Sequence, residues 1–232
     1  SSEHVQQHVM VLPSHNDKKT WLKEMVPVLA QVGRTLVFVA KRSDCEEIAE
    51  MLRQQSLRIE TLHGEKHQSD RNASLRAFAK GDLDALIATD VAARGLDVKN
   101  VSTVINFDPA KNLDSHVHRI GRAGRLSKDE HNKGVAYTLL TQKNADFAHV
   151  LMSAFEREGR EVTDALRSLA EKSRKSGNVA SRTKWNKSGL GFNDHNDLPN
   201  GGSSGGGGNG YYGPSTSQAA AGAPPTKRSR WE

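Results

Sequence analysis

Short apolar runs alternate with stretches of helical periodicity over roughly the first 160 residues of the chain. The run TLVFVA at Thr35–Ala40 is apolar throughout, which is typical of a strand buried on both faces of a parallel sheet. The pattern predicts strands at Val9–Leu12, Thr35–Ala40, Arg58–Leu62, Ala85–Ala88, Val101–Phe107 and Val135–Leu140. It predicts helices at 17–32, after Ser43, and at Gln68–Lys80, Asp114–Gly121, Asn144–Arg157 and Thr163–Lys172. Strands separated by helices predict βαβ units, and therefore one doubly wound α/β domain built on a parallel sheet of about six strands.

Three local signals refine these elements. Ser43 is followed three residues later by Glu46, which predicts a capping box at the start of a helix. Gly81 predicts the C-terminal end of the preceding helix. Pro27 lies inside the first helical pattern, and it predicts a kink or an early end because proline has no amide hydrogen.

Charge and composition divide the chain into two parts. The net charge is +6, but residues 1–172 hold 25 Lys and Arg against 24 Asp and Glu, whereas residues 173–232 hold 8 against 3. The second part also contains 12 of the 20 glycines, and it cannot bury enough apolar surface to offset the entropy of ordering. We therefore expect a domain at 1–160, a trailing helix at 161–172 and a disordered, basic, Gly/Ser-rich tail at 173–232.

The sequence also disfavours several classes of protein. No apolar run approaches the roughly 18 residues of a membrane span, and no N-terminal segment has the pattern of a signal peptide. A single cysteine, Cys45, excludes a disulfide framework, and its helical pattern favours a small core residue over a reactive thiol. The pairs His63/His67 and His116/His118 have ligand-like spacing but lack further ligands nearby, so we expect no metal site.

The segment HRIGRAGR at His118–Arg125 is the richest candidate for chemistry. Arg122 and Arg125 are three residues apart, so on a helical turn they point the same way and can grip a polyanion. The interleaved glycines allow a ligand to approach the backbone closely. This residue choice fits a phosphate whose charge changes during reaction, where an arginine finger lowers the barrier. The alternative is a solvated basic helix end, which would not require the glycines.

A second candidate segment, ATDVAARGLD at Ala88–Asp97, follows a predicted strand. Thr89 and Asp90 could simply cap a short helix, but capping does not explain the Arg-Gly-Leu-Asp that follows. Two absences matter as well, because the chain contains no G-x-x-x-x-G-K-[ST] phosphate loop and no strand that ends in two acidic residues for Mg²⁺. The chain thus carries arginines for a nucleotide without the nucleotide's main cradle.

Four segments together resemble the second RecA-like lobe of a DEAD-box ATP-dependent RNA helicase. Leu36–Ala40 resembles motif IV of that family, and His63–Arg71 resembles its HG…QxxR segment. Ala88–Asp97 resembles motif V, and His118–Arg125 resembles motif VI. The four segments occur in the family's order, each at the end of a predicted strand. Within the family, the resemblance leans toward the spliceosome-associated branch.

The resemblance implies a site for ATP that is shared between two lobes. Arg122 and Arg125 match the arginine fingers, and His118 matches a residue that links motif VI to the other lobe. Asp97 matches the motif V carboxylate near the ribose and the attacking water, and Gly95 lies beside it on the ATP side. ATP and Mg²⁺ would be held mainly by lobe 1, so we expect the chain to be inactive alone and to act as part of an ATP-hydrolysing RNA helicase.

The resemblance also implies an RNA surface and some partners. Arg71, Thr89, Arg94 and Gly64 match positions on the RNA side, where contacts to phosphates and 2′-hydroxyls give little sequence specificity. The partners expected are single-stranded RNA and lobe 1 of the same polypeptide, with local duplex unwinding or RNP remodelling as the outcome. We expect a monomer in the nucleus, with the cytoplasm also open, and no membrane partner.

The C-terminal KRSRWE suggests a separate interaction. Arg230 and Trp231 resemble the short ligand that splicing factors offer to modified RNA-recognition domains, and a nuclear-localisation patch or simple RNA affinity remain alternatives. Two other functions also stay open for the whole chain. One is a free-standing RNA-binding or adaptor module of splicing or mRNP complexes, and the other is a DNA helicase of the same superfamily.

Overall fold

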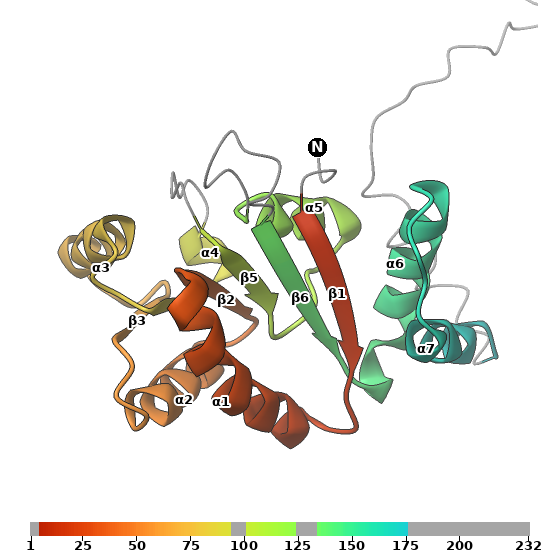
Figure 1. Cartoon of the computed structure of the whole chain (residues 1–232), viewed down its shortest axis with the longest axis horizontal. Coiled ribbons are helices and arrows are strands. Elements are labelled where there is room, and N and C mark those ends of the chain that lie inside the picture. The colour runs from red at the N-terminus through yellow and green to blue at the C-terminus, as the bar shows by residue number, and fades with distance from the viewer. Residues whose placement is uncertain (1–4, 94–100, 124–133, 176–232) are drawn as a thin grey trace, which may run out of the picture. The chain divides into compact units, whose positions relative to one another are not determined.

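The computed structural model of the chain describes residues 5–93, 101–123 and 134–175, all within one unit that spans Ser1–Gly191 (Figure 1). The strands are β1 (Val5–Val11), β2 (Thr35–Val39), β3 (Ile59–Leu62), β4 (Ala85–Thr89), β5 (Thr103–Asn106) and β6 (Gly134–Leu140). The helices are α1 (His15–Val32), α2 (Arg42–Arg53), α3 (Gln68–Lys80), α4 (Asp90–Ala93), α5 (Leu113–Ile120), α6 (Ala145–Arg157) and α7 (Asp164–Lys175), with a single 3-10 turn, η2 (Gln142–Asn144), before α6.

The described strands form one sheet in the order β1-β6-β5-β2-β4-β3, and every neighbouring pair is parallel. The predicted α/β class and the parallel sheet of about six strands are therefore confirmed. All strands point the same way, so their carboxyl ends meet at one edge of the sheet. Ligand sites of open α/β sheets lie outside that edge.

β1 differs most from its prediction. It begins at Val5, opposite Gly134 of β6, whereas the apolar pattern placed its start at Val9. β1 lies at the edge of the sheet and pairs with β6 alone, so the polar side chains of Gln6 and Gln7 are tolerated in its first half. A search for continuous apolar runs detects strands that are covered on both faces, and it missed the polar half of this edge strand.

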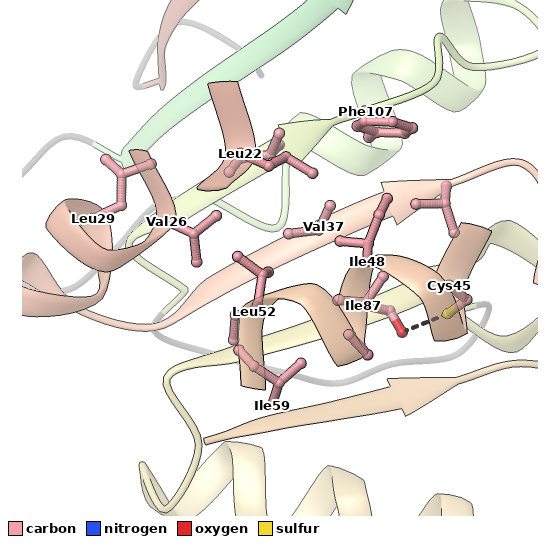
Figure 2. Close-up of a cluster of buried hydrophobic side chains, with 14 of the residues drawn as sticks. Leu22, Val26, Leu29, Val37, Cys45, Ile48, Leu52, Ile59, Ile87 and Phe107 are labelled. Atoms are coloured by element: carbon pink, nitrogen blue, oxygen red, sulfur yellow. Dashed lines mark hydrogen bonds between the residues drawn. The ribbon is translucent and has the colours of Figure 1, made fainter. Parts of the chain in front are cut away.

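α1 and α2 cover one face of the sheet, and their apolar side chains interdigitate with those of β2 and β4 (Figure 2). The fully buried members of this layer include Leu22, Val26, Val37, Ile48, Leu52 and Ile87. Burying a side chain of this size contributes about 1.5–3 kcal/mol. This layer therefore holds the central strands, and with them the strand ends, in fixed positions.

α3, α4 and α5 contribute Phe78, Ala92 and Ile120 to a second layer on the opposite face, packed around Leu36 and Leu86. α6 and α7 pack against each other in a third cluster beside β1 and β6. α7 runs through Lys175, past the boundary expected at residue 172, so residues 173–175 are helical and not part of the tail. The rest of the expected tail, residues 176–232, lies outside the described residues.

The predicted capping box is wrong. α2 begins at Arg42, with Lys41 at its N-cap and no capping hydrogen bond from a side chain, because the helix starts before Ser43. Glu46 accepts hydrogen bonds from Thr61 of β3 and from His63, directly after β3, and therefore ties α2 to the end of that strand. The end of α3 is as predicted, because Gly81 adopts a left-handed conformation with φ of 88°.

α1 is not shortened at Pro27, since it runs on to Val32. Pro27 cannot donate a hydrogen bond to the carbonyl of Lys23, one turn earlier. Instead, Nε2 of Gln55, just after α2, donates to that carbonyl at 3.1 Å. A side chain from the neighbouring segment thus replaces the bond that the proline removes.

Cys45 is a core residue, as its helical pattern predicted, and its Sγ lies 3.1 Å from the carbonyl oxygen of Ile87 (Figure 2). Burial raises the pKa of the Cys45 thiol to about 11. At pH 8 the thiolate is then about a thousandth of the population, so we expect iodoacetamide to label the folded chain negligibly and the urea-unfolded chain fully. Mass spectrometry of both samples measures this, and full labelling without urea would contradict it.

Candidate functional site

The candidate residues lie at or just beyond the carboxyl ends of β3, β4 and β5, in the part of the sheet ordered β5-β2-β4-β3 (Figure 1). Gly64 follows β3, Thr89 ends β4, and His118 lies on α5, which follows β5. Arg71 lies in the first turn of α3 and reaches α4 with its side chain. Parallel pairing of the strands thus brings residues that are far apart in the sequence to one edge of the sheet.

Arg119 of α5 is the best-connected side chain at this edge, and it is only 4% exposed. Its Nε and Nη2 donate to the two carboxylate oxygens of Asp90 at 2.7 and 2.8 Å. Its Nη1 donates to the carbonyl oxygen of Asp108 at 2.7 Å and to Oδ1 of Asn106 at 3.2 Å. The guanidinium also lies over the ring of Phe38, 4.9 Å from its centre. One side chain therefore joins α5 to α4 and to the ends of β2 and β5.

Arg119 was not among the predicted site residues, whereas Arg122 and Arg125, on either side of Gly124, were. A usable signal was present in the spacing of the apolar residues. His116, Ile120 and Ala123 are buried and recur at helical spacing, and Arg119 falls on the same inward face. An arginine on the buried face of a helix needs buried acceptors, and these are found at the ends of the neighbouring strands.

A second buried cation supports the same strand ends. Nζ of Lys18, in the first turns of α1, donates to the carbonyl oxygen of Phe107 at 2.7 Å and lies 3.8 Å from Oδ1 of Asp108. Oδ2 of Asp108 accepts a hydrogen bond from the amide of Ala40 at 2.8 Å. Burial lowers the pKa of Lys18, and the Asp108 carboxylate opposes that shift. The segment that leads from β5 to α5 is therefore fixed from both sides of the sheet.

A cavity of about 190 Å³ opens between α4 and α5, with Arg119 and Phe38 among its lining residues. Ser115 and His118 of α5 line one side, together with Lys111 just before the helix and Arg122 just after it. The carboxylate of Asp90, also in the lining, is already held at both oxygens by Arg119. Because Arg119 neutralises Asp90, Lys111 and Arg122 give the cavity a net positive charge, which suits an anion.

His118 and Arg122 differ in how they are held. The side chain of His118 is 72% exposed, and its Nδ1 lies 3.8 Å from Oδ2 of Asp114 one turn earlier. Arg122 is half-buried just after α5. The imidazole of His118 is thus exposed on α5 and Arg122 lines the cavity just after the helix, while Arg119 fixes α5 underneath.

The side chain of Arg71 extends from α3 to α4. Its Nη1 donates to Oε1 of Gln68 at 3.2 Å, and its Nη2 donates to the carbonyl oxygen of Ala92 at 3.3 Å. Its Nε is buried and has no hydrogen-bond partner in the described part of the chain. The guanidinium therefore retains a donor while it ties α3 to α4.

Gly64 stands in the turn after β3, and nothing in the described structure requires a glycine there. A Cβ atom added at residue 64 would meet no atom within 4 Å, and the backbone is not in the left-handed region. Gly33 provides a contrast, because a Cβ there would clash with the hydroxyl of Ser102. Neither packing nor backbone conformation among the described residues therefore requires glycine at residue 64.

Several of the predicted site residues lie outside the described residues. They are Arg94, Gly95 and Asp97 of the second segment and Arg125 of the first, together with Arg230 and Trp231 of the tail. The structure thus brings together Arg122, His118 and the α4–α5 cavity on one side. On the other side it brings together Arg71, Thr89 and Gly64.

Across the described ranges, no group of three or more His, Cys, Asp or Glu side chains could hold a metal ion. His116 and His118 cannot converge, because the first is buried under α5 and the second is exposed. Burial, together with the nearby charge of Arg119, lowers the pKa of His116 to about 3, so this imidazole is neutral. Within the same residues, no helix is both long and apolar enough to cross a bilayer.

These features define a RecA-like α/β lobe with a positively charged cavity at the carboxyl edge of its sheet. Residues 17–127 match the family described as helicase conserved C-terminal domain. The chain is 45% identical over 190 residues to DEAD-box ATP-dependent RNA helicase 24 of Oryza sativa subsp. japonica, covering 82% of this chain and 24% of that protein. It is 40% identical over 204 residues to ATP-dependent RNA helicase DDX42 of Homo sapiens, covering 85% and 21%. The chain thus spans less than a quarter of the length of these relatives.

Solved structures show the same likeness. The E. coli DEAD-box protein SrmB, determined in complex with RraA, is 32% identical with a TM-score of 0.56, covering 70% of this chain and 93% of that one. The RNA helicase Prp28 from Chaetomium thermophilum, bound to ADP, is 33% identical with a TM-score of 0.60, covering 70% and 39%. The chain belongs to the DEAD-box family of ATP-dependent RNA helicases, as the C-terminal RecA-like lobe.

The contacts of Arg119 predict a loss of stability on conservative substitution. Arg119→Lys removes the paired hydrogen bonds to Asp90 and leaves that carboxylate partly buried without its partner. We expect the free energy of unfolding to fall by about 2 to 3 kcal/mol, measured by urea denaturation followed by circular dichroism. The control is Arg157→Lys, at an exposed arginine of α6 that makes one hydrogen bond at 3.3 Å. Equal midpoints for the two variants would contradict the prediction.

Proposed function

We propose that this chain acts as the second lobe of an ATP-dependent RNA helicase, supplying arginine fingers for ATP hydrolysis and half of an RNA-binding surface. The observation that carries the proposal is the positively charged cavity between α4 and α5, with Arg122 and His118 presented beside it. Its position at the carboxyl edge of a parallel sheet is where α/β folds bind nucleotides.

On the ATP side, each proposed role follows from charge and reach. Arg122 and Arg125 stabilise the negative charge that develops on the γ-phosphoryl group as it is transferred, a task that suits a guanidinium held in place beforehand. His118 is exposed and free to contact the other lobe across the cleft. Asp97 and Gly95 contact the ribose side of the nucleotide.

On the RNA side, the proposed contacts are to the sugar-phosphate backbone. The guanidinium of Arg71 supplies a positive charge beside α4, and Gly64 leaves its backbone uncovered. Thr89 and Arg94 are the other two proposed RNA contacts, because of their positions in the segment ATDVAARGLD at Ala88–Asp97. Contacts of this kind hold a single strand in place with little sequence preference.

The two half-sites act together through closure of two lobes. ATP and RNA each contact both lobes, so each ligand favours the closed state in which the arginines reach the phosphate. The described residues offer no acidic cluster that fits Mg²⁺, so in this proposal lobe 1 holds the metal ion and the phosphate loop. Closure bends the bound strand and separates a short duplex, and hydrolysis allows the lobes to reopen.

The proposal extends to a setting in RNA processing. One structural neighbour is described as the yeast DEAD-box splicing factor Prp28, at 29% identity with a TM-score of 0.64. A monomer that remodels RNA–protein complexes in the nucleus agrees with that likeness. The KRSRWE segment, with Arg230 and Trp231, is proposed to dock on a splicing factor.

The first test concerns the chain by itself. Without lobe 1 there is no phosphate loop, so we expect no RNA-stimulated ATP hydrolysis above the buffer rate. A phosphate-release assay with and without single-stranded RNA measures this, and the full-length protein that contains the chain is the positive control. Turnover by the chain alone would contradict the proposal. RNA binding without activity in the full-length protein would favour the adaptor alternative.

The second test concerns the finger assignment. In the full-length protein, Arg122→Ala should lower kcat by about 10³-fold, because a finger acts mainly in the transition state. RNA affinity should stay within about twofold, since Arg122 lies on the ATP side. Steady-state ATPase kinetics and fluorescence anisotropy give the two values, with Arg157→Ala on α6 as the matched arginine control. A loss of RNA affinity as large as the loss of kcat would refute the assignment.

A further inference from the structure

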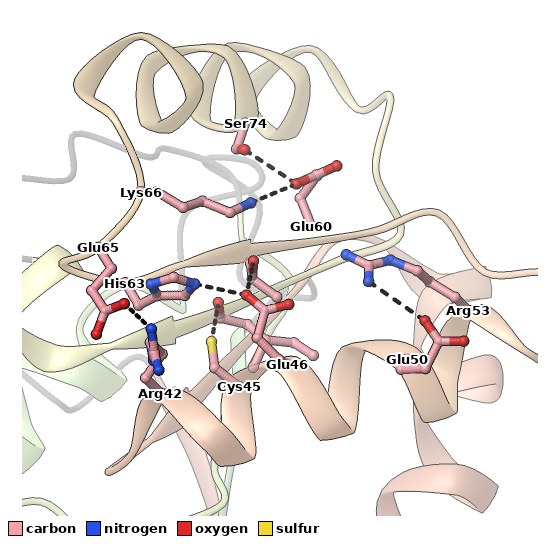
Figure 3. Close-up of polar contacts among 12 residues, drawn as sticks. Arg42, Cys45, Glu46, Glu50, Arg53, Glu60, His63, Glu65, Lys66 and Ser74 are labelled. Carbon is pink, nitrogen blue, oxygen red and sulfur yellow. Dashed lines mark hydrogen bonds and ion pairs between the residues drawn. The ribbon is translucent and has the colours of Figure 1, made fainter.

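Glu46 of α2 reaches across to the turn that follows β3 (Figure 3). Its Oε1 accepts hydrogen bonds from Nε2 of His63 at 2.7 Å and from Oγ1 of Thr61 at 2.9 Å. Because a carboxylate can only accept, Nε2 of His63 carries the hydrogen. The side chain of His63 is 9% exposed, and its Nδ1 has no hydrogen-bond partner among the described residues. A single carboxylate thus fixes a buried imidazole in one tautomer and one orientation.

The geometry is reflected in the pKa of Glu46. Burial alone would raise that pKa, but the hydrogen bonds from His63 and Thr61 lower it below its ordinary value. The carboxylate is therefore ionised at neutral pH and engaged from two sides. Hydrogen bonds to an ionised acceptor are stronger than neutral ones, so this contact is the firm anchor of the turn.

Two more ion pairs hold the same turn from different sides. Arg42 of α2 pairs with Glu65, and Nζ of Lys66 lies 3.0 Å from Oε2 of Glu60 on β3 (Figure 3). The Arg42–Glu65 pair is exposed, and exposed pairs contribute little to stability, whereas the Lys66–Glu60 pair is partly buried. Every charged or imidazole side chain of residues 63–66 is nevertheless engaged. Gly64 alone has no side chain to hold.

The turn leads directly into the first turn of α3. His67 is the N-cap of α3, and the amide of Arg71 donates to its carbonyl oxygen at 3.0 Å. The position of the turn therefore determines where the uncovered backbone of Gly64 lies and where the side chain of Arg71 begins. Within the described part of the chain, the hydrogen bonds of Glu46 go to Thr61 and His63, neither of which lines the cavity between α4 and α5.

We propose that Glu46 is a positioning residue for RNA binding, acting through His63 on the turn that carries Gly64. The inference rests on the proposed function, because it takes Gly64 and Arg71 as RNA contacts. A turn fixed before binding loses less conformational entropy when the strand arrives, so affinity depends on the anchor. The nucleotide cavity is built from other elements. The effect of Glu46 should therefore fall on RNA and not on ATP.

The test compares two substitutions of equal length in the full-length protein. Glu46→Met keeps the shape of the side chain but offers no oxygen, whereas Glu46→Gln retains an acceptor for His63 and Thr61. RNA affinity is measured by anisotropy with a short fluorescein-labelled oligouridine and a non-hydrolysable ATP analogue. We expect Glu46→Met to weaken RNA binding about five- to tenfold and Glu46→Gln to restore most of it. The KM for ATP should stay within about twofold for both variants.

A matched control lies one turn further along α2. Glu50 is exposed and pairs with Arg53 at 3.9 Å, so Glu50→Met should leave RNA affinity unchanged. Thermal melting of each variant accompanies the binding data. If Glu46→Met melts below the assay temperature, Glu46→Ala is judged by the same criteria at a temperature where it is folded. An equal loss of RNA and ATP affinity would overturn the proposal, because it would indicate general destabilisation.

Arg71→Ala separates this inference from the proposed function. If Arg71→Ala weakens RNA binding but Glu46→Met does not, the role of Glu46 is refuted and the RNA surface stands. If Arg71→Ala and Gly64→Ala both leave RNA affinity unchanged, the proposed RNA surface is refuted and the role of Glu46 falls with it. Weakening by all three variants, with Glu50→Met unaffected, supports both.

Discussion

The pairing of Arg119 with Asp90 is the interaction on which the candidate site depends. A buried guanidinium is costly unless each of its donors is satisfied, and here the carboxylate, an amide oxygen, a backbone carbonyl and an aromatic face supply the partners. These partners come from the ends of three strands, or from the segments directly after them. Their convergence fixes the position of α5, whose outer surface carries His118. Buried Arg119 thus holds the helix that leads directly to Arg122 at the cavity.

α4 is the element shared by the two halves of the site. It is only four residues long, yet Asp90 receives Arg119 from α5 and the carbonyl of Ala92 receives Arg71 from α3. The two contacts are two residues apart in α4. The proposed RNA side and the proposed ATP side of the lobe are therefore joined through a single turn of backbone.

The sequence predicts the sheet well because central strands buried on both faces are continuous apolar runs, as in β2. It predicts the positions of the motifs because parallel strands place their carboxyl ends together. The first half of β1 was missed because an edge strand tolerates polar residues such as Gln6. The capping box at Ser43 was wrong because Glu46 finds partners from another part of the chain, and local spacing carries no information about distant acceptors. Helical spacing places Arg119 on the buried face of α5, but it does not identify the partners, because these lie at or just after the ends of three strands.

Gly64 shows how stability and binding can place opposite demands on one position. Replacing a glycine by alanine at an unstrained, open position typically stabilises a folded chain by about 0.4–1 kcal/mol, because the unfolded chain loses freedom. Residue 64 meets both conditions. A design procedure that scores only the free energy of folding would therefore remove this glycine, and a thermal screen would count the change as an improvement. If Gly64 contacts RNA as proposed, the stability lost through the missing methyl group is the counterpart of a surface that the backbone of a nucleic acid can approach.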